Sequence, residues 1–252
     1  MQPLSASDLL DVWERGAGRT PVEQGLVLLA YAFPRAPYSR LAGLTIGQRD
    51  ACLLELRALT FGAQLSGVVT CPACGERLEM GFDAGDLLRS GASLPDPESG
   101  ETQPETSALV LAPYEIDFRL PTSADLNAAA RREDPGQARQ QLLQACLVDV
   151  RKDGQAVPAG ELPAPILEAV GERIGQVEPL ADLDLAAVCP ACGHAWHVLF
   201  DIVSFFWSEI EARAARLMRE VHVLASAYGW READILALSP WRRQRYLELS
   251  GT

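Results

Sequence analysis

Two short segments of the chain, 118 residues apart, carry the same cysteine motif. Residues 69–75 read VTCPACG, and residues 187–193 read AVCPACG. The likeness continues downstream at the same offset, where Phe82 corresponds to Phe200. Each copy starts with small or β-branched residues, turns at the cysteines and then alternates apolar and polar residues, which is typical of a β-strand. The repeat therefore predicts two equivalent β-hairpins, each with a cysteine pair in its turn.

The four cysteines of these hairpins have the residue type and the spacing of a metal site. Two residues between the cysteines let both sulfurs of one turn face a single cation, and the glycine that follows permits a backbone that directs N–H groups at the sulfurs. Zn²⁺ takes four such thiolates at about 2.3 Å in a tetrahedral structural site. One zinc ion is therefore expected between the hairpins, bound by Cys71, Cys74, Cys189 and Cys192.

The remaining cysteines and two nearby histidines are weaker candidates for metal binding. His194 and His197 lie two and five residues after Cys192, and either could replace a cysteine as a ligand. Because four thiolates already saturate a tetrahedral site, we expect both histidines to be exposed hairpin residues. Cys52 and Cys146 stand alone in apolar helical patterns and are expected in the core, since a free cysteine packs as a small hydrophobe.

Two other classes of protein use cysteine pairs of this kind. Thiol–disulfide redox proteins share the CxxC spacing, but they place the pair at the start of a helix, whereas here a glycine and a strand follow. Zinc-ribbon nucleic-acid-binding or transcription-associated modules need basic surroundings. This chain has 34 acidic against 22 basic residues, and the flanks of the cysteines are acidic. The charge therefore disfavours nucleic acid and anionic membrane surfaces as partners.

The sequence lacks the signatures of several common enzyme classes. It has no Gly-Lys-Ser/Thr phosphate loop, no GxGxxG, no HExxH and no GxSxG. No stretch approaches the roughly 20 consecutive apolar residues of a membrane span. The first residues show no cationic start followed by an apolar run, so we expect a cytoplasmic protein without a signal peptide. A non-enzymatic role is the prediction that follows.

The pattern along the chain predicts an α+β fold that is predominantly helical, with a split zinc ribbon of two β-hairpins and a small additional β element. Capping boxes begin helices at Thr20 and Thr45, and residues 139–150 continue a helical region. Residues 91–107 are polar and rich in Pro, Gly, Ser and Glu, which predicts a flexible linker. The expected regions are 1–66 (N-terminal helices), 67–90 (first hairpin), 91–107 (linker), 108–186 (inserted β/helical region), 187–202 (second hairpin) and 203–252 (C-terminal helices).

Four segments together resemble one known family. They are LTIGQRDACLLELRALTFGAQLSGVVTCPACGERLEMGFDAGDLL, IDFRLPTSADL, VCPACGHAWHVLFDIVSFFWSEI and VHVLASAYGWREADILALSPWRRQRYLEL. The chain resembles the T4-like baseplate hub assembly protein (chaperone) family of contractile phages and extracellular contractile injection systems. The resemblance covers most of the chain outside the linker and the N-terminal residues.

This resemblance implies a non-enzymatic baseplate component or hub assembly factor whose partners are other baseplate, hub or spike proteins. It carries over the four cysteines as zinc-binding positions. It also implies a cytoplasmic assembly site, and leaves open whether the protein stays in the assembled particle.

The C-terminal region carries the residues that we expect to contact such partners. Large aromatic side chains and arginines dominate interface energetics, although the same side chains can instead belong to the core. The predicted partner surface consists of Trp207, Trp230, Trp241, Arg242, Arg243 and Tyr246.

Overall fold

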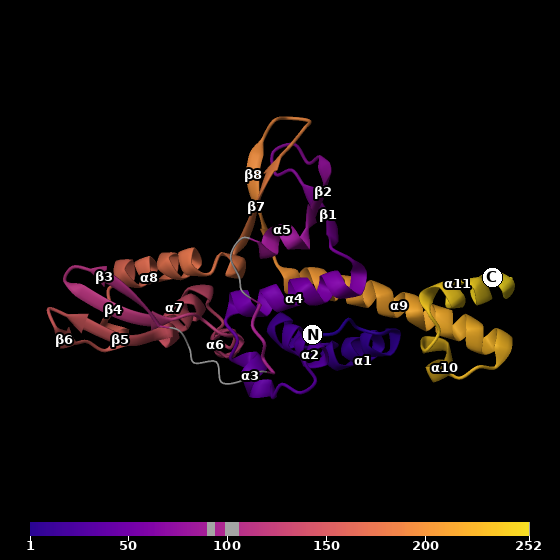
Figure 1. Ribbon diagram of the computed structural model, residues 1–252. Helices are drawn as coiled ribbons and strands as arrows, with labels where there is room; N and C mark the ends of the chain where they lie inside the picture. Colours follow the sequence, from indigo (N-terminus) through magenta and orange to yellow (C-terminus); the bar gives the residue numbers. More distant parts are fainter. Residues whose placement is uncertain (90–93, 99–105, 252) are drawn as a thin grey trace.

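The computed structural model describes residues 1–89, 94–98 and 106–251, and these form an α+β fold that is predominantly helical. A helical body lies at the centre of Figure 1, two β-hairpins rise from it, and an inserted unit lies to one side. The end of the longest helix and the C-terminal helices extend on the opposite side from the insert. The fold class predicted from the sequence is thus confirmed as a mixed, mainly helical α+β protein.

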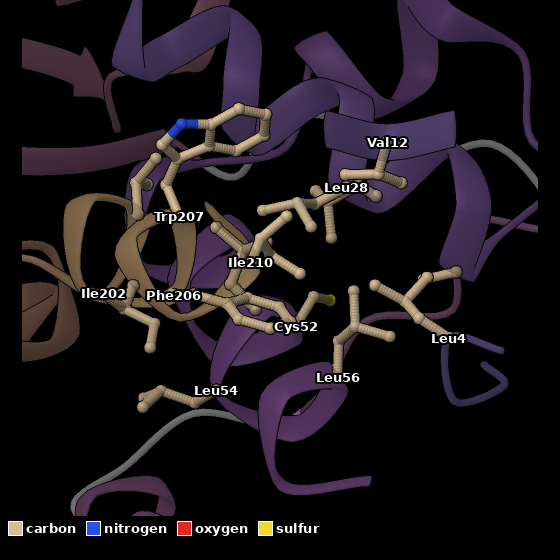
Figure 2. Close-up of a cluster of buried hydrophobic side chains, with 14 of the residues drawn as sticks. Leu4, Val12, Leu28, Cys52, Leu54, Leu56, Ile202, Phe206, Trp207 and Ile210 are labelled. Carbon is tan, nitrogen blue, oxygen red and sulfur yellow. The ribbon is translucent and has the colours of Figure 1, made fainter. Parts of the chain in front are cut away.

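The helical body forms because the N-terminal helices bury their apolar faces against one long helix near the C-terminus. Its core contains Phe206 and Ile210 of that helix together with Cys52, Leu56 and Leu28, as Figure 2 shows. The body is made of α1 (Ala6–Gly16), α2 (Pro21–Ala32), α3 (Tyr38–Ala42), α4 (Ile46–Phe61) and α9 (Ile202–Tyr228).

Both predicted capping boxes are present and start the helices where the sequence places them. Thr20 accepts a hydrogen bond from the Glu23 N–H, and the Glu23 carboxylate accepts one from the Thr20 N–H at 3.1 Å. Thr45 and Gln48 form the same reciprocal pair at the start of α4. Each box satisfies two backbone donors that a helix start otherwise leaves unpaired.

The two hairpins have equivalent registers. In the first hairpin Leu65 is opposite Phe82, and in the second Leu183 is opposite Phe200. Each of these positions differs from its counterpart by the 118-residue offset of the sequence repeat. The strands are β1 (Gln64–Thr70), β2 (Arg77–Asp83), β7 (Leu183–Val188) and β8 (Ala195–Phe200).

The repeat extends into the helix that follows each hairpin. Asp83 caps α5 (Ala84–Leu88) by accepting a hydrogen bond from the Gly85 N–H at 2.8 Å. Asp201, its counterpart, caps α9 by accepting from the N–H groups of Val203 and Ser204. The two copies therefore share a strand, a cysteine turn, a second strand and a capped helix.

The inserted unit has a sheet and a core of its own. The sheet is antiparallel in the order β3-β4-β5-β6, and buried side chains such as Phe118, Cys146 and Val170 form a second hydrophobic cluster beneath it. Its elements are β3 (Thr106–Leu111), β4 (Tyr114–Arg119), α6 (Ser123–Ala129), α7 (Pro135–Cys146), β5 (Leu147–Lys152), β6 (Gln155–Ala156), η1 (Ala159–Glu161), α8 (Ala164–Val177) and η2 (Pro179–Ala181).

One expectation for this part of the chain is corrected, and five residues of the expected linker can be placed. The helix predicted over residues 139–150 ends at Cys146, and residues 147–152 form β5, where Val150 is buried against the sheet. Within the expected linker 91–107, residues 94–98 contact the helical body: Arg35 pairs with Glu98 at 2.7 Å, and Pro97 is buried. The rest of the linker as far as residue 105 lies outside the described residues.

The insert contacts the start of α4 through a buried carboxylate. Glu178 accepts a hydrogen bond from the Thr45 hydroxyl, and its side chain lies so close to Gly47 that a Cβ there would overlap it. A single β-bridge joins Thr45 to Thr122, and the Ile46 N–H donates to the Pro121 carbonyl at 3.0 Å.

At the other end of the molecule, α10 (Glu232–Leu236) and α11 (Pro240–Leu249) fold back on the end of α9. The Arg243 guanidinium is 1% exposed and pairs with Glu220 of α9 at 3.0 Å. It also donates to the Leu238 carbonyl at 2.6 Å, so one side chain joins α11, α9 and the loop after α10. Among the described residues, no helix combines the length and the apolar character needed to cross a membrane.

Candidate metal centre

The four predicted cysteines meet where the tips of the two hairpins come together. All four sulfurs lie within 4.8 Å of one another. Cys71 Sγ is 3.8 Å from Cys192 Sγ, and Cys74 Sγ is 3.6 Å from Cys189 Sγ. The first cysteine of each turn thus faces the second cysteine of the other turn, as it would under an approximate twofold axis.

The backbone of the two turns is the same. The Gly75 N–H donates to the Cys71 carbonyl at 2.9 Å, and the Gly193 N–H donates to the Cys189 carbonyl at 2.8 Å. Both glycines have a positive φ, +77° and +74°, which a residue with a Cβ adopts only at a cost. The glycine that ends each CPACG motif therefore closes the turn that presents both sulfurs.

The spacing of the sulfurs fits a tetrahedral metal ion. With metal–sulfur distances of about 2.3 Å, the edges of a tetrahedron measure about 3.8 Å. The two cross-hairpin distances, 3.8 and 3.6 Å, match that edge. A disulfide needs about 2.05 Å between sulfurs, so the arrangement is that of four free thiols converging on one point.

The electrostatics of the cluster also favour a cation. Desolvation opposes ionisation of Cys71, but N–H groups of Cys74 and Ala73 donate to its sulfur and the pKa of the thiol falls to about 7. At Cys74 the Glu76 N–H favours the thiolate, yet the neighbouring sulfurs raise the pKa to about 12. Four thiolates this close repel one another unless a positive ion lies between them, and a bound metal deprotonates its thiol ligands.

Burial divides the four cysteines into two types. Cys71 and Cys189 are each 1% exposed, while Cys74 and Cys192 lie at the exposed rim. Further down the hairpins, Phe82 and Phe200 meet edge to face with ring centroids 4.9 Å apart. These two rings are counterparts in the repeat, so the hairpins contact each other through equivalent residues at both levels.

Neither histidine belongs to the cluster. His197 Nδ1 lies 2.8 Å from Asp184 Oδ2, and the His194 ring stacks on Trp196 with centroids 5.9 Å apart. Both side chains are exposed, as the sequence predicted. Cys52 and Cys146 are buried core residues, and burial raises the pKa of these thiols to about 12 and about 11. The lone cysteines therefore stay protonated at neutral pH.

The predicted C-terminal contact residues fall into different environments. Trp207 is 6% exposed in the main core and Arg243 is 1% exposed, so the prediction that these two form a partner surface is corrected. Trp230 and Tyr246 are half-buried and pack edge to face, with centroids 4.8 Å apart. Trp241 and Arg242 are exposed; Trp241 has 71% of its surface in contact with solvent.

Two neighbours of Trp241 lie on the same helical face: Arg245, which stands in the basic cluster around Trp241 in the sequence, and Leu249, which the sequence reasoning missed. Arg245 lies over the Trp241 ring at 5.9 Å, and Leu249 is 76% exposed. Residues four apart lie one above the other on a helix, so Trp241, Arg245 and Leu249 form one exposed stripe of α11. The four-residue spacing of these side chains was the signal that could have identified the stripe.

The fold and the site together define a class: an α+β protein whose two repeated hairpins form one closed four-cysteine centre, suited to holding structure together. A family model described as T4 bacteriophage base plate protein matches residues 35–207. This match spans more than half of the chain and includes both cysteine pairs, so the chain belongs to the T4 bacteriophage base plate protein family. No curated protein and no solved structure matches the chain.

Proposed function

We propose that this protein is a non-enzymatic hub component or hub assembly factor of the baseplate of a contractile injection machine. The observation that carries the proposal is the family match, which extends from residue 35 through both hairpins and the insert to the first turns of α9. Baseplate components act by contacting other proteins, and the partners proposed here are other baseplate, hub or spike proteins. We place assembly in the cytoplasm, with retention in the finished particle as a testable extension.

The metal proposed for the four-cysteine centre is Zn²⁺, and its proposed role is structural. Four cysteine ligands leave no open coordination position for substrate or water. The ion would join two hairpins that are separated by the whole insert, and closing a longer loop costs only slightly more entropy than closing a short one. Zinc would thereby fix the position at which the insert leaves and re-enters the body.

The proposed contact face is the stripe on α11. Trp241 and Leu249 are exposed apolar side chains, and Arg245 lies over the Trp241 ring between them. Tryptophan and arginine are the residues most enriched among those that dominate binding energy. The buried Arg243–Glu220 pair holds α11 against α9, which would lower the entropy cost of binding a partner through the stripe.

The test is capture of partners by the tagged full-length chain in cells that also express the neighbouring structural genes. We expect baseplate, hub or spike proteins to be retained, and metal analysis of the same sample to give one zinc per chain. Substituting Trp241→Ala together with Leu249→Ser should abolish capture while leaving zinc content and melting temperature unchanged. Val110→Ser, at an exposed apolar position of the insert, is the matched control.

Two results would overturn the proposal in favour of the alternative classes. Tight, salt-sensitive retention of mixed DNA or RNA on filters would favour a nucleic-acid-binding module. Rapid thiol–disulfide exchange with a model disulfide would favour a redox protein.

A further inference from the structure

The C-terminal part of the chain has the opposite charge to the rest. The chain as a whole has a net charge of −12, yet residues 212–252 contain seven arginines against four acidic residues. Most of this positive charge lies on α9 and α11, close to the proposed contact face. A partner that meets this part of the molecule therefore encounters a basic surface on an otherwise acidic protein.

Two of these arginines share one carboxylate. Glu220 accepts from Arg216 Nε at 2.9 Å through one oxygen and from Arg243 Nε at 3.0 Å through the other. A third arginine, Arg213, is half-buried one turn earlier on α9. In the described part of the chain, no carboxylate pairs with Arg213.

Two other acidic side chains, Glu209 and Asp8, are already engaged. Glu209, one turn before Arg213, uses both carboxylate oxygens to accept from Arg57, at 2.9 and 2.6 Å. Asp8 on α1 accepts from the Ser5 backbone and hydroxyl. Burial lowers the pKa of Arg213, and the neighbouring cations Arg216 and Arg243 lower it further. The Glu220 carboxylate acts in the opposite direction and raises it. An additional anion beside Arg213 would relieve this repulsion.

Arg213 lines a cavity large enough to receive such an anion. The cavity has a volume of about 450 Å³ and lies between the start of α1, the end of α4, α9 and the α10–α11 loop. Its apolar walls include Leu4, Leu9, Phe61 and Leu236, and its polar groups include Arg213 and Arg243. Arg213 also borders a second cavity of about 360 Å³ with Arg57 and Arg216. A mixed lining of this kind fits an acidic side chain flanked by apolar ones.

We propose that this cavity, called the Arg213 pocket, binds a glutamate or aspartate side chain of an apolar segment on a partner protein. The inference rests on the proposed function only in assigning the segment to a baseplate partner. The guanidinium of Arg213 is planar and can donate two parallel hydrogen bonds to a carboxylate. The apolar walls of the pocket favour aliphatic residues on either side of that acidic residue, because burying aliphatic side chains against them is favourable. The same apolar walls have no polar groups that would bind the sugar of a nucleotide.

The pocket can be tested on the full-length protein alone. The probe is the capped peptide acetyl-Leu-Glu-Leu-amide, and acetyl-Leu-Gln-Leu-amide is its uncharged match. Binding is followed by NMR of the arginine Nε–H signals. We expect saturable binding in the millimolar range for the acidic peptide and no saturation for the uncharged one.

Arg213→Gln should weaken binding of the acidic peptide roughly tenfold to a hundredfold, as loss of a charge-assisted bidentate pair does. Arg213→Lys should restore part of it, because the charge returns without the fork. Arg219→Gln, at an exposed position of the same helix, is the control and should leave binding unchanged.

Three outcomes would overturn the proposal that the Arg213 pocket binds an acidic side chain. They are equal binding of both peptides, unchanged affinity in Arg213→Gln, and tighter binding of inorganic phosphate than of the acidic peptide. This experiment does not need a baseplate partner, so its result is separable from the capture experiment. If the acidic peptide binds but no baseplate protein is captured, the proposed function alone is rejected. If the acidic peptide does not bind and the Arg213→Gln variant still captures baseplate proteins, the pocket alone is rejected.

Discussion

Arg57 of α4 and Glu209 of α9 form a two-pronged ion pair with N–O distances of 2.9 and 2.6 Å. The Arg57 side chain is 5% exposed, and its remaining nitrogen donates to the carbonyls of Gly62 and Gln64, where α4 ends and β1 begins. One guanidinium therefore fixes the first hairpin to the helix that follows the second. This pair connects the helical body to the candidate metal centre without touching a cysteine.

Removing this guanidinium should be costly. We expect Arg57→Ala to lower the free energy of unfolding by about 2–4 kcal/mol, because it leaves a partly buried Glu209 and two backbone carbonyls without their donor. Urea unfolding measures the change. Arg151→Ala breaks an exposed pair with Asp149 and should cost less than about 1 kcal/mol. Equal costs for the two variants would show that Arg57 does not join the elements as described.

Loss of one thiolate should release the metal. Cys71→Ser should abolish stoichiometric zinc and lower the melting temperature, because metal binding contributes directly to folding. Elemental analysis and thermal unfolding provide the measurements, with and without a chelator. Cys146→Ala removes a buried sulfur from the insert and should reduce stability while keeping the zinc. Full metal content in Cys71→Ser would contradict the four-cysteine assignment.

Packing against Trp207 depends on the absence of a side chain at position 16. A Cβ at Gly16 would overlap the indole ring of Trp207, which is buried in the main core. Gly16→Ala should therefore destabilise the protein by about 1–3 kcal/mol. Gly175→Ala is the control on α8, where a Cβ meets open space, and should stabilise it by roughly 0.5–1 kcal/mol. Both values come from denaturant unfolding, and a gain in stability for Gly16→Ala would refute the contact.

A buried carboxylate on α4 should make stability depend on pH. Burial raises the pKa of Asp50 to about 6, although the Arg49 guanidinium, 2.7 Å away, acts to lower it. The folded state thus holds a proton more tightly than the unfolded chain, in which an aspartate has a pKa of about 3.9. The stabilising contribution of that proton is complete below about pH 4 and is lost as the pH rises through 6.

The variant Asp50→Asn isolates this effect. It leaves Arg49 without its carboxylate and is expected to lower stability in general. However, the free energy of unfolding of the variant relative to that of the unchanged protein should rise by on the order of 2 kcal/mol as the pH is raised from 4.5 to 7.5. Urea unfolding at a series of pH values tests this expectation. A difference between the two proteins that stays constant with pH would show that Asp50 does not titrate in this window.

The part of the structure that could be predicted best is the part that the sequence repeats. The equal offset between the cysteine motifs and their flanking residues predicts two equivalent hairpins, and four thiols can satisfy a metal only if the hairpins meet. The capping boxes at Thr20 and Thr45 are local, so the start of each helix could be identified without tertiary information.

The errors arise where distant residues decide the outcome. Residues 147–152 follow a good helical segment, but Val150 pairs with Ile116 in a sheet that the local pattern does not reveal. The neighbouring arginines in the sequence suggest that Arg243 is exposed to solvent. In the structure it is buried and pairs with Glu220, which lies 23 residues earlier. In each case the partner is close in space and far in sequence.

The reciprocal pairing of Cys71 with Cys192 and of Cys74 with Cys189 has a consequence for how such a centre can arise. It is an isologous interface, the kind that two identical subunits form, contained within one polypeptide. Two copies of an ancestor with a single hairpin would close the same tetrahedron as a dimer. Fusion of the copies would leave the connecting segment free to grow into a unit with its own core.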